Sequence, residues 1–349
     1  MIKAVISGTG LYTPPATITN DELVTAFNAF VERYNAEHAN EIASGEREAL
    51  EPSSSAFIEK ASGIKRRHVI DKKGILDPER MCPNIPDRPN DEPSIQCEMS
   101  VAACKGALEQ AGKTPSDVDA VIVACSNLQR AYPAVAVEVQ AALGVEGFAY
   151  DMNVACSSAT FGLQAAVNSV ENGSARSVLV VSPEICSGHL EWRDRDCHFI
   201  FGDVCTAVLI EPAEEAKAAH FRIKSTRCAT KFSNNIRNNN GFLRRSRPDG
   251  LADRRDMQFG QDGRRVFKEV LPMVSAHILS HLEDAGVPAD GLRRLWLHQA
   301  NKAMNDFIGR KVMGRVPEPH EQPNILQDYA NTSSAGSIIA FSQYSDDLA

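Results

Sequence analysis

Apolar positions along this chain follow two periods, and the two alternate. Short runs rich in Val, Ile and Ala predict buried strands at 2–7, 119–126, 147–154, 177–183 and 204–211. Between them, apolar residues recur every three or four positions, which predicts helices at 94–111, at 134–144 and from the turn at 156 to about 172. Strands that alternate with helices in this way are typical of an α/β layered fold.

A charged, alanine-rich stretch at 211–220 interrupts the pattern, and we place the domain boundary there. The second part also alternates strands with helices, with strands predicted at 219–226 and 294–299 and helices at 264–286 and 301–313. The chain is therefore expected to divide into an N-terminal half, 1–212, and a C-terminal half, 213–349.

Two polar segments depart from this alternation. Residues 27–56 form a charged insertion, for which we expect an exposed helix with a mobile tail, with a lid over a substrate entrance as the alternative. Residues 233–250 are polar and rich in turn-forming residues, which predicts a surface loop.

The composition narrows the class of protein. The 349 residues are 43% hydrophobic and 23% charged, as in soluble globular proteins. A net charge of −8 without a basic tract argues against a nucleic-acid partner, and no apolar run approaches the roughly 18 residues of a membrane span. Nine cysteines without a C-x-x-C pair indicate neither a disulfide framework nor a zinc site, so we expect a reduced, cytoplasmic protein. His277 and His281 have metal-ligand spacing, but no third ligand is in view, and we predict no metal site.

One cysteine stands where an α/β sheet places reactive groups. Cys156, in DMNVACSSAT, lies between a predicted strand and a predicted helix. The free N–H groups and the positive dipole end at a helix start favour a thiolate, whereas burial alone would accept any small apolar residue. His298 ends a predicted strand and Asn331 opens a further helix in YANTSSAGSII, so both occupy similar positions.

Taken singly, each of the three residues has a structural explanation. A buried cysteine is usually a small core residue, a lone histidine is usually a satisfied polar group, and Asn331 is a good helix N-cap. Three such positions in the order Cys, His, Asn instead favour a nucleophile with two polar partners.

Several stretches of the chain resemble one family, the β-ketoacyl-acyl-carrier-protein synthases III, which belong to the thiolase-fold condensing enzymes. They are ACSSATFGLQAA, FGDVCTAVLIE, DGRRVFKEV, HQANKAMNDFIGRK and NTSSAGS, with ISGTGLYTPPATITNDEL and ASGIKRR matching the family's opening. The resemblance covers nearly the whole chain. It implies two similar halves in a five-layered αβαβα fold, and a homodimer.

The resemblance also implies a reaction, a decarboxylative Claisen condensation in fatty acid biosynthesis. An acyl-CoA, or another acyl thioester, would prime malonyl-acyl-carrier protein and give a 3-oxoacyl-acyl-carrier protein. Cys156 would accept the acyl group, while His298 Nε2–H and the Asn331 amide would bind the malonyl thioester and stabilise its enolate oxygen. No cofactor is expected, and the partners would be CoA thioesters, acyl carrier protein and a second copy of the chain.

The resemblance implies substrate-binding residues as well. Phe57 and Ala61 fall where the family has a tryptophan and an arginine beside the CoA adenine, which predicts a weaker grip on the nucleotide. Tyr132 matches a position that closes the acyl pocket from the partner subunit, and we expect substrate contacts from Arg264 and Asn301. Two basic helices would dock the acidic carrier protein, through Lys268, Arg310 and Lys311.

The chain departs from the family in two places. After FGD, Val204, Cys205 and Thr206 replace the commoner Gly-Ala-Gly. The family continues past the point where FSQYSDDLA ends, into a strand with a glycine-rich turn, so either the sequence is truncated or the fold is completed in another way. The primer chain length stays open, as does the choice between a CoA-bound and a carrier-bound primer.

Three other functions compete with this one. A related thiolase-fold enzyme, such as hydroxymethylglutaryl-CoA synthase, a long-chain head-to-head synthase or a secondary-metabolite synthase, is the nearest. The first two would need a glutamate near the cysteine, and no glutamate here occupies a motif that matches. A papain-like cysteine hydrolase shares the order Cys, His, Asn, but its thiol lies near the mature N-terminus among aromatic neighbours. A catalytically idle scaffold would not need all three side chains.

Overall fold

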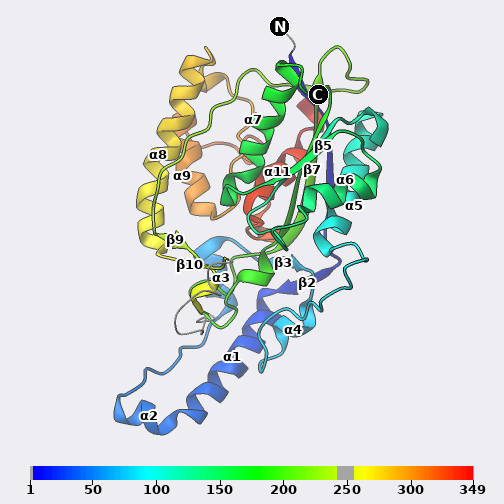
Figure 1. Cartoon of the computed structure of the whole chain (residues 1–349). Helices are drawn as coiled ribbons and strands as arrows, with labels where there is room; N and C mark the ends of the chain where they lie inside the picture. The colour runs from blue at the N-terminus through cyan, green and yellow to red at the C-terminus, as the bar shows by residue number, and fades with distance from the viewer. Residues whose placement is uncertain (1–2, 242–254, 349) are drawn as a thin grey trace.

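A six-stranded mixed sheet forms the centre of the computed structural model, which describes residues 3–241 and 255–348 (Figure 1). In sheet order the strands are β5 (Phe148–Met152), β4 (Ala120–Ala124), β6 (Val178–Ile185), β7 (Asp203–Pro212), β1 (Ala4–Tyr12) and β8 (Phe221–Arg222). β4 is parallel to β5 and β6, whereas β7 is antiparallel to both β6 and β1. This sheet and its helices confirm the predicted α/β class.

The side chains of β4 alternate between two layers of helices. Val121 and Val123 join one core cluster with α5 and α6, and Ile122 and Ala124 join another with α7. This is the period of two expected for a strand buried on both faces. The helices on the sheet are α5 (Ile95–Ala111), α6 (Val135–Leu143), α7 (Ser158–Glu171) and α11 (Gly336–Tyr344).

The GTG motif of β1 lets the sheet approach α5 very closely. A Cβ on Gly10 would lie 1.8 Å from the carbonyl oxygen of Ala103, and a Cβ on Gly8 would lie 2.1 Å from that of Ala107. Both distances are far inside van der Waals contact, so no other residue fits without moving the helix.

The C-terminal half builds a further helical layer from α8 (Gly263–Asp284) and α9 (Lys302–Met313), which run along one side of the molecule in Figure 1. The two helices share a small apolar core that includes Leu271, Leu297 and Ile308. None of the helices in the described ranges is long and apolar enough to cross a membrane. The division at 212/213 stays a prediction.

The two strands predicted for this half are largely wrong. β8 covers only Phe221–Arg222, and residues 294–299 form no strand. Leu295 and Leu297 are buried, as the alternation predicts. The Leu295 N–H donates to the carbonyl of Glu321 at 2.8 Å, but no described segment continues a ladder beside it. Apolar alternation thus identified buried positions but not pairing, because a strand also needs a hydrogen-bonded neighbour.

The insertion forms an arm that projects from the body in Figure 1, with α1 (Asn20–Glu37) and α2 (Ala39–Ser44). α1 begins where it does because Thr19 and Glu22 form a capping box. Its inner face is buried through Phe27 and Phe30, whereas α2 has no buried residue.

The predicted mobile tail of the insertion is instead fastened to α1. Asn28 accepts from the N–H of Ser53 at 2.8 Å and donates to its carbonyl at 3.1 Å. Two turns further along the same face, Asn35 binds the N–H and the carbonyl of Leu50, both at 2.9 Å. Two side-chain amides therefore hold the returning segment in register, because each satisfies both backbone groups of one residue.

The smaller elements are β2 (Ala16–Thr19), α3 (Ser55–Ser62), β3 (Arg66–Val69), α4 (Lys72–Leu76), β9 (Ile236–Arg237), β10 (Gly260–Gln261) and α10 (Leu326–Tyr329). β2 pairs with β3, and β9 with β10. The predicted loop 233–250 thus contains a short strand, and its part after 241 lies outside the described residues.

Candidate active site

The turn that carries Cys156 joins β5 to α7. One turn of 3-10 helix, η2 (Ala155–Ser157), precedes α7, so the thiol lies at the start of a helical segment, as predicted. Ala155 has φ +49°, a left-handed conformation that non-glycine residues rarely adopt. The hydroxyl of Ser158 closes this turn, donating to the Ala155 carbonyl at 2.7 Å and accepting from the Val154 N–H at 2.9 Å.

A second turn, η7 (Ser333–Ala335), lies against η2. The hydroxyl of Ser333 donates to the sulfur of Cys156 at 3.6 Å. Ser333 also has a left-handed backbone, with φ +50°. The N-terminal and C-terminal halves therefore meet at the thiol.

Asn331 sits just before η7 and is 6% exposed. Its backbone N–H donates to the carbonyl of Ile200 at 2.9 Å, and its side-chain oxygen accepts from the Ser333 N–H at 2.9 Å. The side-chain NH2 has no protein partner within the described part of the chain, so it is the group available to a ligand.

His298 belongs to the same cluster, because its ring lies close to the backbone of Ser333. Burial lowers the pKa of His298 to about 4, so the imidazole is neutral near pH 7. Nδ1 is buried and has no hydrogen-bond partner in the described structure, whereas we expected Nε2 to be the nitrogen that faces substrate. A neutral imidazole suits a hydrogen-bond donor better than a strong base.

The thiolate expected from the helix start is opposed by burial. Desolvation raises the pKa of the Cys156 thiol, the hydrogen bond from Ser333 lowers it, and the charge of Glu184 raises it again. The net shift is upward, so the protonated thiol is the resting form.

Glu184, near the end of β6, is a residue that the motifs did not reveal. It is fully buried and binds Ser126 and Ser334. The signal in the sequence was a single carboxylate inside the apolar run VLVVSPEI, at the strand end where α/β sheets carry working groups.

Phe57 lies on α3 with the guanidinium of Arg195 over its ring, 4.4 Å from the centroid. Arg195 also donates to the carbonyl of Pro52 at 2.9 Å, which ties it to the end of the insertion. A cation is therefore present at Phe57 although Ala61 removes the one expected there. No pattern in the sequence predicted this contact, because Arg195 comes from a distant turn.

Asn301 is the N-cap of α9. Its side-chain oxygen accepts from the N–H groups of Ala303 and Met304, and its NH2 donates to the carbonyl of Ala61 at 2.8 Å. Both ends of the amide are thus used to join α9 to α3, and its contact with substrate stays a prediction. The expected basic residues are exposed on α8 and α9, at Arg264, Lys268, Arg310 and Lys311.

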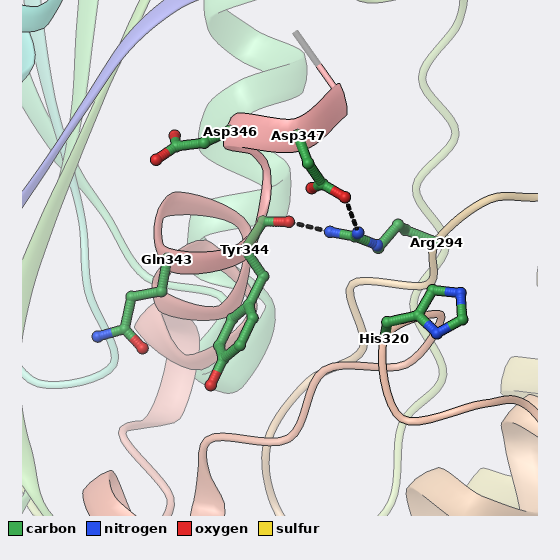
Figure 2. A pocket seen from close by; sticks show the side chains of 6 residues that line it. All are labelled: Arg294, His320, Gln343, Tyr344, Asp346 and Asp347. Atoms are coloured by element: carbon green, nitrogen blue, oxygen red, sulfur yellow. Dashed lines mark hydrogen bonds and ion pairs between the residues drawn. The ribbon is translucent and has the colours of Figure 1, made fainter.

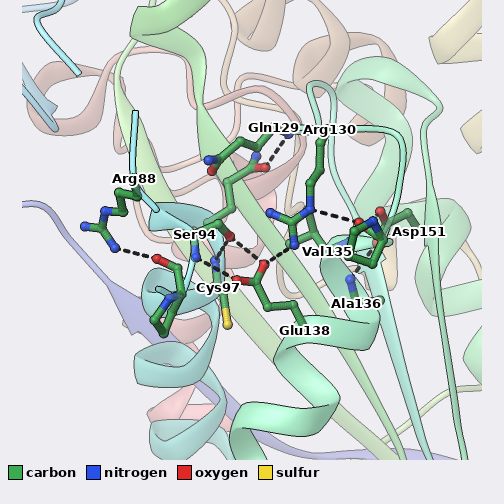
Figure 3. A network of polar contacts seen from close by, with 12 residues as sticks. Arg88, Ser94, Cys97, Gln129, Arg130, Val135, Ala136, Glu138 and Asp151 are labelled. Carbon is green, nitrogen blue, oxygen red and sulfur yellow. Dashed lines mark hydrogen bonds and ion pairs between the residues drawn. The ribbon is translucent and has the colours of Figure 1, made fainter. Parts of the chain in front are cut away.

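Tyr132 is 86% exposed on the loop between β4 and α6. Figure 3 shows the polar network that holds this loop. Arg130 donates to Glu138 at 2.5 Å and to the carbonyl of Pro133 at 3.0 Å, and Glu138 also accepts from the Ser94 hydroxyl at 2.8 Å. These bonds fasten the loop to α6, while its aromatic tip, Tyr132, extends into solvent.

Two other features lie apart from this cluster. His277 binds the carbonyl of Arg227 and His281 binds the hydroxyl of Ser225, so the two rings take different partners. A surface pocket, shown in Figure 2, is lined by Arg294, His320, Gln343, Tyr344, Asp346 and Asp347, and includes neither the thiol nor its neighbours.

Comparisons with known proteins identify the family of the chain. Residues 150–230 match the family described as 3-oxoacyl-[acyl-carrier-protein] synthase III, and residues 282–348 match its C-terminal part. The β-ketodecanoyl-[acyl-carrier-protein] synthase of Pseudomonas aeruginosa is 61% identical over 324 residues, which are 93% of this chain and 92% of that protein.

Solved structures agree on the fold. The 3-oxoacyl-(acyl carrier protein) synthase III of Thermus thermophilus superposes with a TM-score of 0.74 at 25% identity, covering 98% of this chain and 90% of that one. The corresponding synthase of Pseudomonas aeruginosa gives a TM-score of 0.73 at 23% identity, covering 98% and 88%. These findings exclude the papain-like hydrolase. The chain belongs to the β-ketoacyl-acyl-carrier-protein synthase III family of thiolase-fold condensing enzymes.

Proposed function

We propose that this protein condenses a medium-chain acyl thioester with malonyl-acyl-carrier protein. The observation that carries the proposal is the meeting of Cys156, His298 and Asn331 around Ser333. The primer length comes from a relative, because a β-ketodecanoyl product has ten carbons and two of them derive from malonate. An eight-carbon primer follows.

In the first half-reaction the Cys156 sulfur attacks the thioester carbonyl of the primer. The C–S bond to CoA breaks, and the thiol proton leaves with the CoA sulfur, so an acyl-cysteine and free CoA result. The hydrogen bond from Ser333 favours the developing thiolate, which burial otherwise disfavours.

In the second half-reaction the malonyl thioester loses carbon dioxide and becomes an enolate. The neutral ring of His298 and the NH2 of Asn331 donate to the enolate oxygen, and such preorganised donors usually supply the largest part of catalysis. The carbanion attacks the acyl-cysteine, the Cys156 thiolate leaves, and it regains a proton from water. These three side chains cover the chemistry, so we propose that no cofactor takes part.

The carrier protein would dock on α8 and α9. Arg264 and Lys268 flank the exposed Phe267 on α8, and Arg310 and Lys311 follow the exposed Phe307 on α9. Basic side chains around apolar ones suit an acidic partner, because charge guides the encounter and apolar contact holds it. This reading supports acyl carrier protein as the partner.

A second copy of the chain would pair with the edge of the sheet at β5. Phe148 and Tyr150 are exposed there and stack with 6.5 Å between ring centroids, and the edge has no partner strand in the described chain. An exposed aromatic edge strand is a template for pairing. Tyr132 would then reach the partner's acyl pocket. We place the enzyme in the cytoplasm, where CoA and carrier-bound acyl groups meet, and all nine thiols are free.

One experiment tests the proposed reaction. The protein is incubated with octanoyl-CoA, and peptide mass spectrometry locates the acyl group. Acylation of Cys156, and its discharge by malonyl-acyl-carrier protein with release of carbon dioxide, is the expected result, and Cys156→Ser should be neither acylated nor active. Acylation of another residue, or none, refutes the proposal.

A further inference from the structure

Glu184 is the best-connected buried carboxylate near the reacting groups. It is fully buried on β6 and accepts hydrogen bonds from two serines. Ser126 donates its hydroxyl at 2.5 Å and its backbone N–H at 3.1 Å, and Ser334 donates its hydroxyl at 2.5 Å and its N–H at 3.2 Å. Each serine therefore gives both of its donors to this one side chain.

The Ser334 side of this network leads to the enolate-binding groups. Ser334 follows Ser333. The N–H of Ser333 donates to the side chain of Asn331, its hydroxyl donates to Cys156, and its backbone lies close to the ring of His298. Ser333 has a left-handed φ, which costs about 1–3 kcal/mol in a non-glycine residue and persists only where neighbouring contacts fix it. The two bonds from Ser334 to Glu184 are contacts of that kind.

The Ser126 side leads to the turn that carries the thiol. The carbonyl of Ser126 accepts from the side chain of Asn153 at 2.7 Å. Asn153 in turn accepts from the N–H of Ala155 at 2.9 Å, and Ala155 is the second left-handed residue of the site. One carboxylate thus joins the two strained turns on either side of the thiol.

We propose that Glu184 is a positioning residue for the condensation step, which it serves by holding η7 and η2 at a fixed separation. This inference rests on the proposed function. No hydrogen bond joins Glu184 to Cys156 in the described structure, so it acts through Ser333 and Asn331. Its oxygens accept from the two serines and, at 3.6 and 3.9 Å, from the buried thiols of Cys125 and Cys186. It is also distinct from the acid/base glutamate of the rival thiolase-fold enzymes, which would need a free oxygen.

A carboxylate suits this position because the four serine donors and the thiols of Cys125 and Cys186 all point at its two oxygens. In Glu184→Gln one oxygen becomes an NH2 group. The serine hydroxyls can turn to accept from it, but a backbone N–H cannot. Both backbone N–H groups bind Oε1, and the Ser126 N–H also lies 3.3 Å from Oε2, so an NH2 group at Oε2 would face the Ser126 amide and one at Oε1 would face both amides. The substitution keeps the shape of the side chain and breaks the geometry of one turn.

The charge of Glu184 gives a second signature. Burial raises the pKa of Glu184, while the hydrogen bonds from the two serines lower it. In its ionised form its charge disfavours the Cys156 thiolate, so removal of that charge should make the thiol more acidic. A residue that only fills space would not have this effect. The pKa of the thiol therefore reports on the charge of Glu184, and the rates of the partial reactions report on its role in positioning the two turns.

The test uses three variants, Glu184→Gln, Ser334→Ala and the double variant of these two. Glu211→Gln is the control. Glu211 is a matched control, because it is also fully buried, but it pairs with Lys113 at 2.6 Å on β7. Four quantities are measured: acylation of Cys156 by octanoyl-CoA, carbon dioxide release from malonyl-acyl-carrier protein, the pH profile of thiol alkylation by iodoacetamide, and Tm.

We expect Glu184→Gln to slow carbon dioxide release about 10- to 100-fold, since small misplacements of catalytic groups cost that much. Acylation should fall less than threefold or so, the alkylation profile should move to lower pH, and adding Ser334→Ala should have little further effect on release. Glu211→Gln should lower Tm and leave both partial reactions unchanged.

Equal losses in acylation and release, an unmoved alkylation profile, or additive effects of the two substitutions would each overturn the assignment. Failure of the unmodified protein to acylate Cys156 would instead refute the proposed function, so the two ideas fail in different ways.

Discussion

The hydroxyl of Ser333 donates to the sulfur of Cys156 across 3.6 Å, joining two residues from opposite halves of the chain. This hydrogen bond lowers the pKa of the thiol, whereas burial and the charge of Glu184 raise it. Ser333 is therefore the neighbour that favours the thiolate.

We expect Ser333→Ala to slow alkylation of Cys156 by iodoacetamide about fivefold to tenfold at fixed pH, because a hydrogen bond to the thiolate is lost. The pH profile of alkylation should move to higher pH. Ser333→Gly also removes the hydroxyl but relaxes the left-handed backbone, so similar profiles in both variants assign the effect to the hydrogen bond. An unmoved profile in both contradicts it.

His298→Ala and Asn331→Ala should block the malonyl step far more than the acyl step. Loss of one donor to a developing oxyanion typically costs about 10²–10³-fold, while burst labelling of Cys156 by octanoyl-CoA should persist. Asn331→Asp is the matched variant, because it keeps the acceptor for the Ser333 N–H and loses the NH2. Labelling that disappears together with carbon dioxide release would show that the roles are not separate.

Charge reversal on the basic helices should weaken carrier-protein binding. We expect Lys268→Glu or Arg310→Glu to raise KM for malonyl-acyl-carrier protein, with a larger effect at low salt, because charges are screened within about 8–10 Å at physiological ionic strength. Lys105→Glu, an exposed reversal on α5, should leave KM unchanged. Identical kinetics in all three variants would show that Lys268 and Arg310 are ordinary solvated surface residues with no role in docking.

The contact between Arg195 and Phe57 predicts a role in CoA binding. The guanidinium lies 4.4 Å from the ring centroid, so Arg195→Ala removes a cation from the face where adenine would stack. A cation–π contact contributes about 1 kcal/mol, and KM for octanoyl-CoA should rise about fivefold. KM for octanoyl-pantetheine, which has no adenine, is the internal control. A parallel rise for both substrates would mean that Arg195 only supports the fold.

Acid should destabilise the protein through its buried histidines. Burial lowers the pKa of His189, His198 and His298 to about 4. The unfolded chain binds these protons below about pH 6.5, so stability is complete above that pH and is lost as pH falls towards 4. Asp203 acts in the opposite sense, because burial raises its pKa to about 6 and its folded form gains a proton first.

His198 offers a clean test, since its ring stacks on Phe27, meets Phe199 edge-on and binds the carbonyl of Arg195. His198→Phe should reduce the difference in unfolding free energy between pH 7 and pH 5 by about 2 kcal/mol. His220→Phe, on an exposed segment, should not change it. Equal pH dependence in both variants would show that His198 does not couple protonation to folding.

Sequence patterns predicted those parts of the fold that depend on local periodicity. The runs that became β4, β6 and β7 are buried on both faces, and the helix between residues 94 and 111 was found within one residue. The strand predicted at 294–299 was wrong, because strand pairing depends on a neighbour that is distant in the sequence. The motifs named three members of the candidate site, but Glu184 was missed, because its role arises from two serines brought together only by folding.

The arm has a consequence for how this family can vary. Asn28 and Asn35 hold the returning segment in place. The residues between Asn35 and Leu50, which include α2, add nothing to the buried core. Chain length at the tip is therefore nearly neutral for folding, since a longer surface loop costs little closure entropy. Evolution could lengthen or trim this tip without disturbing the register of α3.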